Sequence, residues 1–403
     1  MTPEEVARFK FRIFIVLAMK VVLVSRFPSD IDQPRGGVET ATVGLAKALF
    51  SLGITDLHIV TIEKHIAETS IENHEGLTVH RLPRSRWPMI LDAIVGPSVR
   101  ILNRYLRQLE PTVVHYHETW GFSAPKCGFP AVFTVHGFDS LNLVTEKAPF
   151  WRTRSKLWAW AESIGLRKQK HIISIAPYVH GAIKTKTRAK ISDIWNPLNP
   201  LAYTVRGKEK NGSLLFLGWL NPRKNPLVIV KAAAKLIKKH PDLKVRLCGE
   251  ASVPHYFKEL QDAISDFGLT KCVEMPGRLN QSAVRKELST AALLVLPSFQ
   301  ENAPMVIAEA MAAGIPIVAS NLCGIPDMVE DGKSGLLLND PTDADELVNT
   351  LDKLLSNDEL RHCQGESAKY RAEQLFHPTS VASQTIEVYK KAVSDYPFKT
   401  QAN

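Results

Sequence analysis

The sequence predicts an α/β protein of two doubly wound, Rossmann-like domains that face each other across a cleft. Three observations support this fold class. The chain has 403 residues, more than a single hydrophobic core usually organises. Short runs of Val, Ile and Leu alternate with longer helical stretches along the chain. A segment with two prolines, at residues 196–200, interrupts this alternation, which then starts again.

In the first half, the predicted strands are short apolar runs at residues 21–25, 57–61, 77–82, 112–115, 131–135 and 171–175. An amphipathic helix is expected at residues 39–52, after a loop that contains Gly36 and Gly37. Apolar strands separated by helices are typical of a parallel sheet that helices cover on both faces. Ligands of such sheets bind at the carboxyl ends of the strands.

The second half repeats the pattern. Strands are expected at 213–217, 244–248, 273–275, 293–296, 316–319 and 336–338, and helices at 226–239, 256–267, 282–289, 304–313, 343–356 and 379–393. We divide the chain into an N-terminal extension at 1–18, domains at 19–198 and 199–378, and a C-terminal helix with a tail at 379–403. Because the first strand opens just after a start-like Met19, we expect residues 1–18 to be a non-essential extension and not a membrane anchor.

The composition excludes several classes of protein. A hydrophobic fraction of 45% and a charged fraction of 23% are ordinary for a globular protein and argue against disorder. Five cysteines occur without a Cys-x-x-Cys pair, which excludes a disulfide framework and a zinc ribbon and suits a reducing compartment. No segment has the ~18 consecutive apolar residues of a transmembrane helix. We therefore expect a cytoplasmic protein.

Positive charge is concentrated in the first half. Residues 1–198 contain 26 Lys and Arg against 17 Asp and Glu, whereas the remainder contains 24 of each. The stretch 146–190, called the basic segment below, contains 11 basic and two acidic residues, interleaved with tryptophans. Such a surface suits an anionic membrane or nucleic acid, and a solvated helix with inward-packed aromatics is the structural alternative. Our hypothesis is peripheral docking on the inner face of a membrane, with no nucleic acid as a partner.

The most informative stretch, residues 297–320, reads as strand, loop, helix, glycine stop and strand. Glu301 lies in the loop before the helix, and Glu309 lies inside the helix. The N-terminus of a helix attracts a phosphate through its free N–H groups and partial positive charge. Carboxylates accept hydrogen bonds from hydroxyls, so the pair predicts a ligand with both phosphate and sugar groups. Acidic residues that merely favour the helix dipole are the alternative.

A second cluster follows a predicted strand that ends at Gly218. Two adjacent cations, Arg223 and Lys224, precede a helix with Pro226 in its first turn. Positive charge is unfavourable at a helix N-terminus, which counts against a merely solvated pair. An arginine fork beside a lysine can neutralise a departing diphosphate.

In combination, these motifs resemble those of retaining glycosyltransferases of the GT-B fold, in particular glycosyltransferase family 4 (glycosyl transferases group 1). Glu301 and Glu309 match that family's Glu-x7-Glu motif. Residues 310–319 and 324–327 match the sequence that follows the motif, and residues 222–225 match the family's basic phosphate-binding turn.

The resemblance implies a role for each motif. Glu309 would bind the ribose of a nucleotide, and Glu301 the hydroxyls of the donor sugar. Many members have an arginine directly after the strand-ending glycine, where this chain has Trp219. We therefore assign the contact with the diphosphate to Arg223, together with Lys224.

The other donor-binding positions that the resemblance implies are Gly36, Gly37, Arg278, Asn302, Pro304, Met305 and Val306. Arg278 would lie in the loop at the nucleobase. The family usually has Pro-Phe-Gly after its first glutamate, where this chain has Asn302-Ala303-Pro304, which leaves the donor sugar open. The resemblance covers about residues 20–393 and implies that the C-terminal helix returns to the N-terminal domain.

Three motifs of the first half do not by themselves indicate a function. Gly36 and Gly37 would also suit a plain turn, but the resemblance places them at the donor phosphates. His136 ends a predicted strand and matches the family's acceptor-side histidine, with a structural turn histidine as the alternative. His115 and His117 have the spacing of a metal-binding pair, but no third ligand is evident. We predict no metal and no other cofactor, and the missing Gly-x-Gly-x-x-Gly gives no support to a nicotinamide site.

The resemblance implies a hexosyl- or N-acetylhexosaminyl-type transferase. It would move a sugar from a nucleotide-diphosphate donor to a hydroxyl of a glycan or lipid-linked acceptor, with retained configuration. Residues 19–198 would carry the acceptor side and residues 199–378 the donor side, with Arg223, Lys224, Glu301 and His136 at the reaction centre. A glycosidase is disfavoured because both glutamates lie on the donor side. The alternatives are an epimerase or phosphorylase of the same fold, an inactive partner subunit and a nucleic-acid-binding protein.

Overall fold

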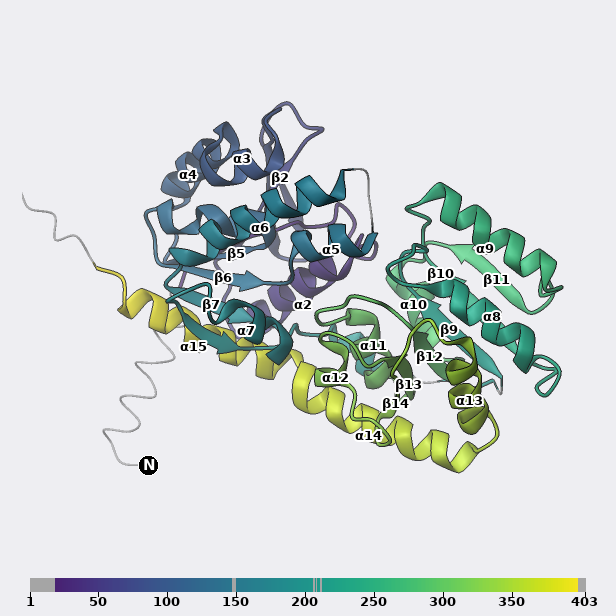
Figure 1. Cartoon of the computed structure of the whole chain (residues 1–403). Helices are drawn as coiled ribbons and strands as arrows, with labels where there is room; N and C mark the ends of the chain where they lie inside the picture. The colour runs from purple at the N-terminus through teal and green to yellow at the C-terminus, as the bar shows by residue number, and fades with distance from the viewer. Residues whose placement is uncertain (1–18, 147–149, 206, 208, 211, 398–403) are drawn as a thin grey trace, which may run out of the picture.

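The computed structural model describes residues 19–146, 150–205, 207, 209–210 and 212–397, so the predicted extension at 1–18 lies outside the described residues. The described chain forms two sheets with helices on both faces of each (Figure 1). This confirms the predicted fold class of two doubly wound α/β units. The first sheet uses strands from residues 21–193 and the second uses strands from residues 213–338.

The first sheet has the strand order β3-β4-β2-β1-β5-β6-β7-β8. Its strands are β1 (Val21–Val24), β2 (Leu57–Glu63), β3 (Ser70–His74), β4 (Leu77–Pro83), β5 (Val113–His117), β6 (Ala131–Val135), β7 (His171–Ser174) and β8 (Lys190–Asp193). Neighbouring strands are parallel except β3, which pairs with β4 in the antiparallel direction. Along β1, Val21 and Leu23 belong to one core, and Val22 and Val24 to the other. This alternation explains why the strand is apolar throughout.

The described residues of the first half form the helical segments α2 (Gly37–Ser51), α3 (Met89–Val95), α4 (Pro97–Leu109), the 3-10 segment η1 (Glu118–Lys126), α5 (Asp139–Glu146), α6 (Trp151–Arg167) and α7 (Pro177–Ile183). The sequence pattern did not predict β3, β8 or the helices from α3 to α7. Both faces of β3 are largely exposed, so it has no apolar signal. The basic segment contributes the end of α5, then α6, β7, α7 and the first residue of β8.

The second sheet is parallel throughout, in the order β11-β10-β9-β12-β13-β14. Its strands are β9 (Ser213–Leu217), β10 (Lys244–Cys248), β11 (Val273–Gly277), β12 (Leu293–Leu296), β13 (Ile317–Ser320) and β14 (Gly335–Leu338). The helical segments of this half are η2 (Pro200–Thr204), α8 (Pro226–Leu236), α9 (Pro254–Asp266), α10 (Gln281–Leu288), α11 (Met305–Ala312), α12 (Ile325–Met328), α13 (Ala344–Leu355) and α14 (Asp358–Phe376). β9 and β12 lie at the centre, and their carboxyl ends lead into the two motifs predicted to bind a donor.

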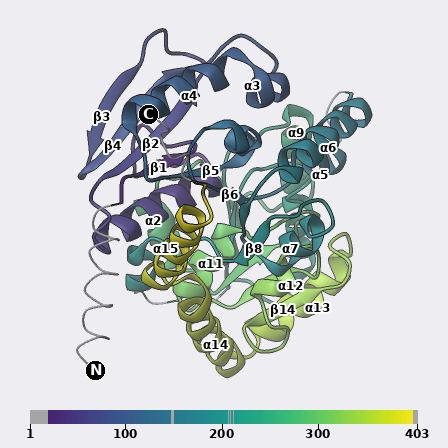
Figure 2. The same ribbon diagram turned by 90° about the vertical axis from the view of Figure 1, so that its left-hand side faces the viewer.

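The last helix connects the second sheet back to the first. α14 packs on α11 and α13, whereas α15 (Pro378–Ser394) packs on α2 and the strands β5 and β6 (Figure 2). In α15 the buried Tyr389 hydroxyl lies 2.7 Å from His115 Nδ1. The backbone N–H of Leu198 donates to the carbonyl of Phe376 at 3.1 Å, so the two segments that connect the sheets lie side by side.

Candidate active site

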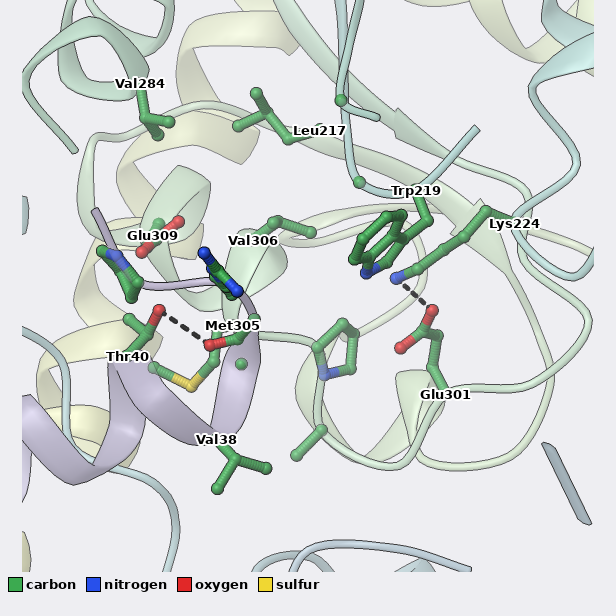
Figure 3. Close-up of a pocket in the computed structure, with 18 of the residues that line it drawn as sticks. Val38, Thr40, Leu217, Trp219, Lys224, Val284, Glu301, Met305, Val306 and Glu309 are labelled. Atoms are coloured by element: carbon green, nitrogen blue, oxygen red, sulfur yellow. Dashed lines mark hydrogen bonds and ion pairs between the residues drawn. The ribbon is translucent and has the colours of Figure 1, made fainter. Parts of the chain in front are cut away.

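A cavity of about 360 Å³ lies between the two sheets, with walls from both (Figure 3). Every residue predicted for donor binding or catalysis lines it: Gly36, Gly37, His136, Arg223, Lys224, Arg278, Glu301, Asn302, Pro304, Met305, Val306 and Glu309. These residues come from five segments that are far apart in sequence. The fold therefore brings together the positions that the motifs singled out.

Two glycines form the floor of the cavity on the side of the second sheet. Gly218 and Gly249 follow the neighbouring strands β9 and β10, and both have positive φ angles, of 151° and 155°. A Cβ atom on Gly249 would lie 1.8 Å from the carbonyl oxygen of Gly218. Only glycine permits this approach of the two backbones, which keeps the strand ends open for a ligand.

Three charged side chains form a compact cluster beside this floor. Lys224 and Glu301 are both largely buried and form an ion pair (Figure 3). Arg223 Nη1 donates to the carbonyl of Gln300 at 2.8 Å and lies 3.3 Å from Glu301 Oε1. Arg223 Nε also lies 3.3 Å from Glu146 Oε1 of α5, so the cluster reaches across the cleft. Burial lowers the pKa of Lys224, and the carboxylate of Glu301 opposes that effect.

Glu309 lies in α11, with 8% of its surface exposed at the wall of the cavity. Burial raises the pKa of its carboxyl to about 7, and Arg285 partly offsets the rise. A buried carboxyl at the edge of a cavity can accept hydrogen bonds from ligand hydroxyls. Its raised pKa makes it a candidate functional group in its own right.

The loop that carries Glu301 is held by a close backbone contact. Gly324 N–H donates to the carbonyl of Glu301 at 2.9 Å. A Cβ atom on Gly324 would lie 1.7 Å from the carbonyl oxygen of Asn302. The Gly-Ile-Pro-Asp segment thus has a structural role that its sequence pattern alone did not reveal: it positions the loop in front of α11.

The first sheet contributes the N-terminus of α2 to the same cavity. Gly37 begins α2, and its added Cβ would lie 3.4 Å from Met305 Cγ at the start of α11. Two helix N-termini therefore point toward one space, an arrangement that suits an anion. A Cβ on Gly36 would meet no atom within 4 Å, so it would extend into the open cavity.

Arg278 lines the cavity from the loop after β11 and also connects the two halves. Its Nη2 donates to the carbonyl oxygen of Gln33 at 2.7 Å, just before the glycine pair of the first half. Next to it, Gln281 N–H donates to the carbonyl of Asp32 at 2.9 Å. These contacts hold the glycine loop against the second half of the molecule.

The two histidines of β5 and His136, which directly follows β6, form hydrogen bonds with neighbouring side chains. His117 Nδ1 lies 2.8 Å from His136 Nε2, and His115 Nε2 lies 2.6 Å from Thr134 Oγ1. Burial lowers the pKa of His115 to about 3 and that of His136 to about 4, so both rings are neutral at physiological pH. His136 Nδ1 has no hydrogen-bond partner among the described residues. Within those residues no group of three or more His, Cys, Asp or Glu is arranged to hold a metal ion.

A second cavity, of about 230 Å³, adjoins the first on the side of the N-terminal sheet. Arg26, Glu118 and Asp139 line it and follow the neighbouring strands β1, β5 and β6. Sequence reasoning missed these three residues. The signal that could have found them is position alone: each is a charged residue at or near the carboxyl end of a strand, where parallel sheets bind ligands.

The outer surface of α5 and α6 combines exposed apolar and basic side chains. Phe150 is 84% exposed, Trp160 51% and Leu157 49%. Arg152 and Lys156 are exposed on the same helix. The alternative in which all aromatics of this helix pack inward is therefore wrong for Trp160. None of the helices in the described part of the chain combines the length and apolar character needed to cross a bilayer.

Family models match both halves of the chain. Residues 35–200 match "Glycosyltransferase Family 4", and residues 205–371 match "Glycosyl transferases group 1". The two matches cover every strand of the two sheets except β1 and contain all the residues predicted for the site.

Related proteins extend over nearly the whole chain. The D-inositol 3-phosphate glycosyltransferase of Corynebacterium aurimucosum is 31% identical over 417 residues, covering 93% of this chain and 97% of its own length. The enzyme of the same name from Arthrobacter sp. (strain FB24) is 27% identical over 423 residues, with 95% and 97% covered.

Solved structures share the fold at lower identity. Sucrose-phosphate synthase from Thermosynechococcus elongatus superposes with a TM-score of 0.79 at 18% identity, covering 94% of this chain and 100% of that one. Anabaena Alr3699/HepE in complex with UDP gives 0.69 at 19% identity, with 93% and 100% covered. The shared arrangement of sheets is that of the GT-B glycosyltransferases. Together with the family models and the full-length relatives, it shows that the chain is a GT-B glycosyltransferase of the group 1 family, resembling glycosyltransferase family 4.

Proposed function

We propose that this glycosyltransferase takes its sugar from a nucleotide-diphosphate donor bound in the 360 Å³ cavity and transfers it to a hydroxyl with retained configuration. The observation that carries the proposal is the cluster of Glu309, Glu301, Lys224 and Arg223 in one partly closed cavity. Such a donor carries ribose hydroxyls, two phosphates and a sugar. The cavity offers a carboxyl, two cations and a second carboxyl for these groups.

In this proposal the charged cluster changes partners when the donor binds. Without donor, Glu301 Oε1 accepts from Lys224 and lies close to Arg223. A diphosphate offers the two cations a stronger anion and frees Glu301 to accept hydrogen bonds from sugar hydroxyls. The N-termini of α2 and α11 add partial positive charge at the same place. These groups stabilise the leaving diphosphate as negative charge develops on it, without a metal ion.

The nucleobase and the acceptor are proposed from the names of related proteins and structures. Solved structures of the same fold contain UDP or UDP-glucose, so UDP-sugars are the first donors to test, with a hexosyl or N-acetylhexosaminyl group transferred. Relatives carry the name D-inositol 3-phosphate glycosyltransferase, which supports a hydroxyl on a ring as the acceptor group. His136, with its unpartnered Nδ1, stands where the two cavities meet and would contact the reacting sugars.

The proposal includes docking on an anionic membrane through α5 and α6, with a glycan or lipid-linked acceptor. Trp160, Phe150 and Leu157 are exposed beside Arg152 and Lys156, and this pairing of apolar and cationic groups complements an anionic lipid surface. The same helices wall the second cavity through Asn142 and Glu162. A lipid-linked acceptor could therefore reach the site without leaving the membrane surface.

Slow hydrolysis of nucleotide sugars tests the donor site directly. We expect the protein to release nucleotide from one donor in a panel of UDP-, GDP- and ADP-sugars, measured by chromatography without acceptor and with added chelator. The Glu309→Ala variant should lower kcat/KM by about 10–100-fold, because it removes a buried acceptor of ribose hydroxyls. Glu366→Ala, on the exposed surface of α14, is the matched control and should leave the rate unchanged. Equal rates for Glu309→Ala and the control would contradict the assignment, and loss of activity with chelator would contradict metal independence.

The raised pKa of Glu309 predicts a pH dependence of nucleotide binding. Ribose hydroxyls donate to the ionised carboxylate, so binding favours the form present above about pH 7. As the pH falls below 7, the free protein is protonated and the affinity should fall, approaching tenfold per pH unit. Calorimetric titration of UDP from pH 8 to about pH 6 measures this, with Glu309→Gln as the control. At each pH, dividing the dissociation constant of the wild type by that of Glu309→Gln cancels the effect of the ionisation of the ligand's own phosphate. A ratio that does not change with pH would show that Glu309 does not titrate at the binding site.

Co-sedimentation with vesicles tests the membrane proposal. The wild type should bind vesicles that contain anionic lipid more tightly than neutral ones. The double variant Arg152→Glu with Lys156→Glu should weaken this binding at least about tenfold, because each basic residue at the surface contributes about 1 kcal/mol. The double variant Lys231→Glu with Lys238→Glu, on exposed positions of the other half, makes the same change in net charge and should bind like the wild type. Docking through this surface would be rejected if binding did not depend on the anionic lipid content. It would also be rejected if both double variants weakened binding equally.

A further inference from the structure

The second cavity opens directly onto the donor site. Val38, His136 and Asn302 line both cavities, so a molecule in the smaller one lies next to the donor. Asn302 belongs to the loop before α11, and a Cβ on Gly137 would lie 2.2 Å from its Nδ2. Gly137 therefore permits the close contact between the two halves at this junction. At about 230 Å³ the cavity is smaller than the roughly 300–1,000 Å³ of typical ligand pockets, which suits a single ring.

Acidic groups outnumber basic ones in the lining of this cavity, whereas basic groups outnumber acidic ones in the lining of the donor cavity. Glu118, Asp139 and Glu162 contribute carboxyl groups, and Arg26 is the cation that lines the cavity. Arg26 Nε already lies 3.1 Å from Glu118 Oε2. His136 is neutral because burial lowers the pKa of its ring to about 4.

The three carboxyl groups differ in how far the protein satisfies them. Glu162 accepts from Ser140 N–H at 3.0 Å and from Ser140 Oγ at 2.6 Å, so it holds the start of α5. Glu118 Oε1 makes no ion pair or hydrogen bond with a described residue. Burial raises the pKa of Glu118 to about 7, and the nearby Asp139 raises it further against the effect of Arg26. Acidic groups therefore lie close together in this cavity, and a ligand that donates hydrogen bonds or carries a positive charge would stabilise their ionised forms.

Apart from Arg26, which is paired with Glu118, no described residue in the lining of this cavity carries a full positive charge that could balance a further negative charge. Lys186 has its Nζ 5.2 Å from the centre of the Phe138 ring, and Phe138 is part of the wall. Lys186 itself is exposed and is not part of the lining. A phosphate inside would face the three carboxyl groups with an arginine that is already paired. By contrast, Arg223 and Lys224 in the neighbouring cavity are positioned for such an anion.

We propose that the 230 Å³ cavity is the acceptor subsite and that it selects an unphosphorylated sugar or polyol ring, neutral or bearing an amino group, which Glu118 and Asp139 bind through its hydroxyl or ammonium hydrogens. This rests on the proposed function and names the chemical class of its acceptor. It also separates the chain from relatives named for D-inositol 3-phosphate, a ring that carries a phosphate. A lipid-linked diphosphate would remain outside the cavity, beside the cations of α6.

Matched pairs of acceptors test the proposal. With the donor found by hydrolysis, transfer is compared for myo-inositol against D-inositol 3-phosphate, and for N-acetylglucosamine and glucosamine against their 6-phosphates. Ligand-observed NMR at millimolar concentration measures binding of the same pairs in the presence of UDP. For each unphosphorylated ring that binds, we expect the rate of transfer and the affinity to exceed those of its phosphorylated partner by at least tenfold. A preference for the phosphorylated ring, equal use of both, or failure of every unphosphorylated ring to bind overturns the proposal.

Variants connect the selectivity to the two carboxyl groups. Asp139→Asn combined with Glu118→Gln should weaken binding of the unphosphorylated ring. The ratio of its affinity to that of the phosphorylated ring should fall toward one. Glu68→Gln, at an exposed position of the same half, is the control and should leave both the binding and the affinity ratio unchanged. Donor hydrolysis is measured for every variant, because it reports on the donor site alone. Unchanged hydrolysis with unchanged selectivity in the double variant rejects the acceptor proposal and leaves the proposed function standing, whereas a wild type without hydrolysis rejects the proposed function itself.

Discussion

The arrangement of the site depends on one buried ion pair, between Lys224 at the end of the first motif and Glu301 at the start of the second. Burying two charges is expensive, and a buried pair is weak support for stability, so its presence in a cleft indicates another purpose. Arg223 lies against the same carboxylate and reaches Glu146 on the opposite wall. Glycines at 218, 249 and 324 let the backbones come close enough to hold these groups in place. The cations are thus kept in the cleft, balanced but available to a stronger anion.

In the proposed function, the two cavities differ in the balance of their charges. The proposed donor cavity combines two helix N-termini with more basic than acidic groups, whereas the adjoining cavity has three carboxyl groups around a paired arginine. They meet at Val38, His136 and Asn302, where a sugar would pass from donor to acceptor. α5 and α6 line the adjoining cavity and present apolar and basic groups outward, which is the face that the proposed membrane docking would use.

The proposed donor site could be predicted from the sequence because its groups lie in two short, contiguous motifs. Residues 217–226 and 296–309 each contain a strand end, a loop and a helix start, so the charged residues could be placed at strand ends and in front of helices. The proposed acceptor cavity could not be predicted, since Arg26, Glu118 and Asp139 follow three separate strands, and only the order β1-β5-β6 brings them together. The hydrophobic pattern did not predict the strand β3, because neither of its faces is buried. The contact of Arg223 with Glu146 and the role of Gly324 are products of tertiary packing, which no local pattern encodes.

A crystal structure with UDP and its sugar donor would test the central claim most directly. The account predicts that the ribose hydroxyls donate to Glu309 and that the diphosphate lies between the N-termini of α2 and α11. It further predicts that Lys224 and Arg223 contact phosphate oxygens, while Glu301 has left Lys224 and accepts from the sugar. A nucleotide bound elsewhere, or one bound in this cavity with the Lys224–Glu301 pair intact and Glu309 without a ligand hydroxyl, would contradict it.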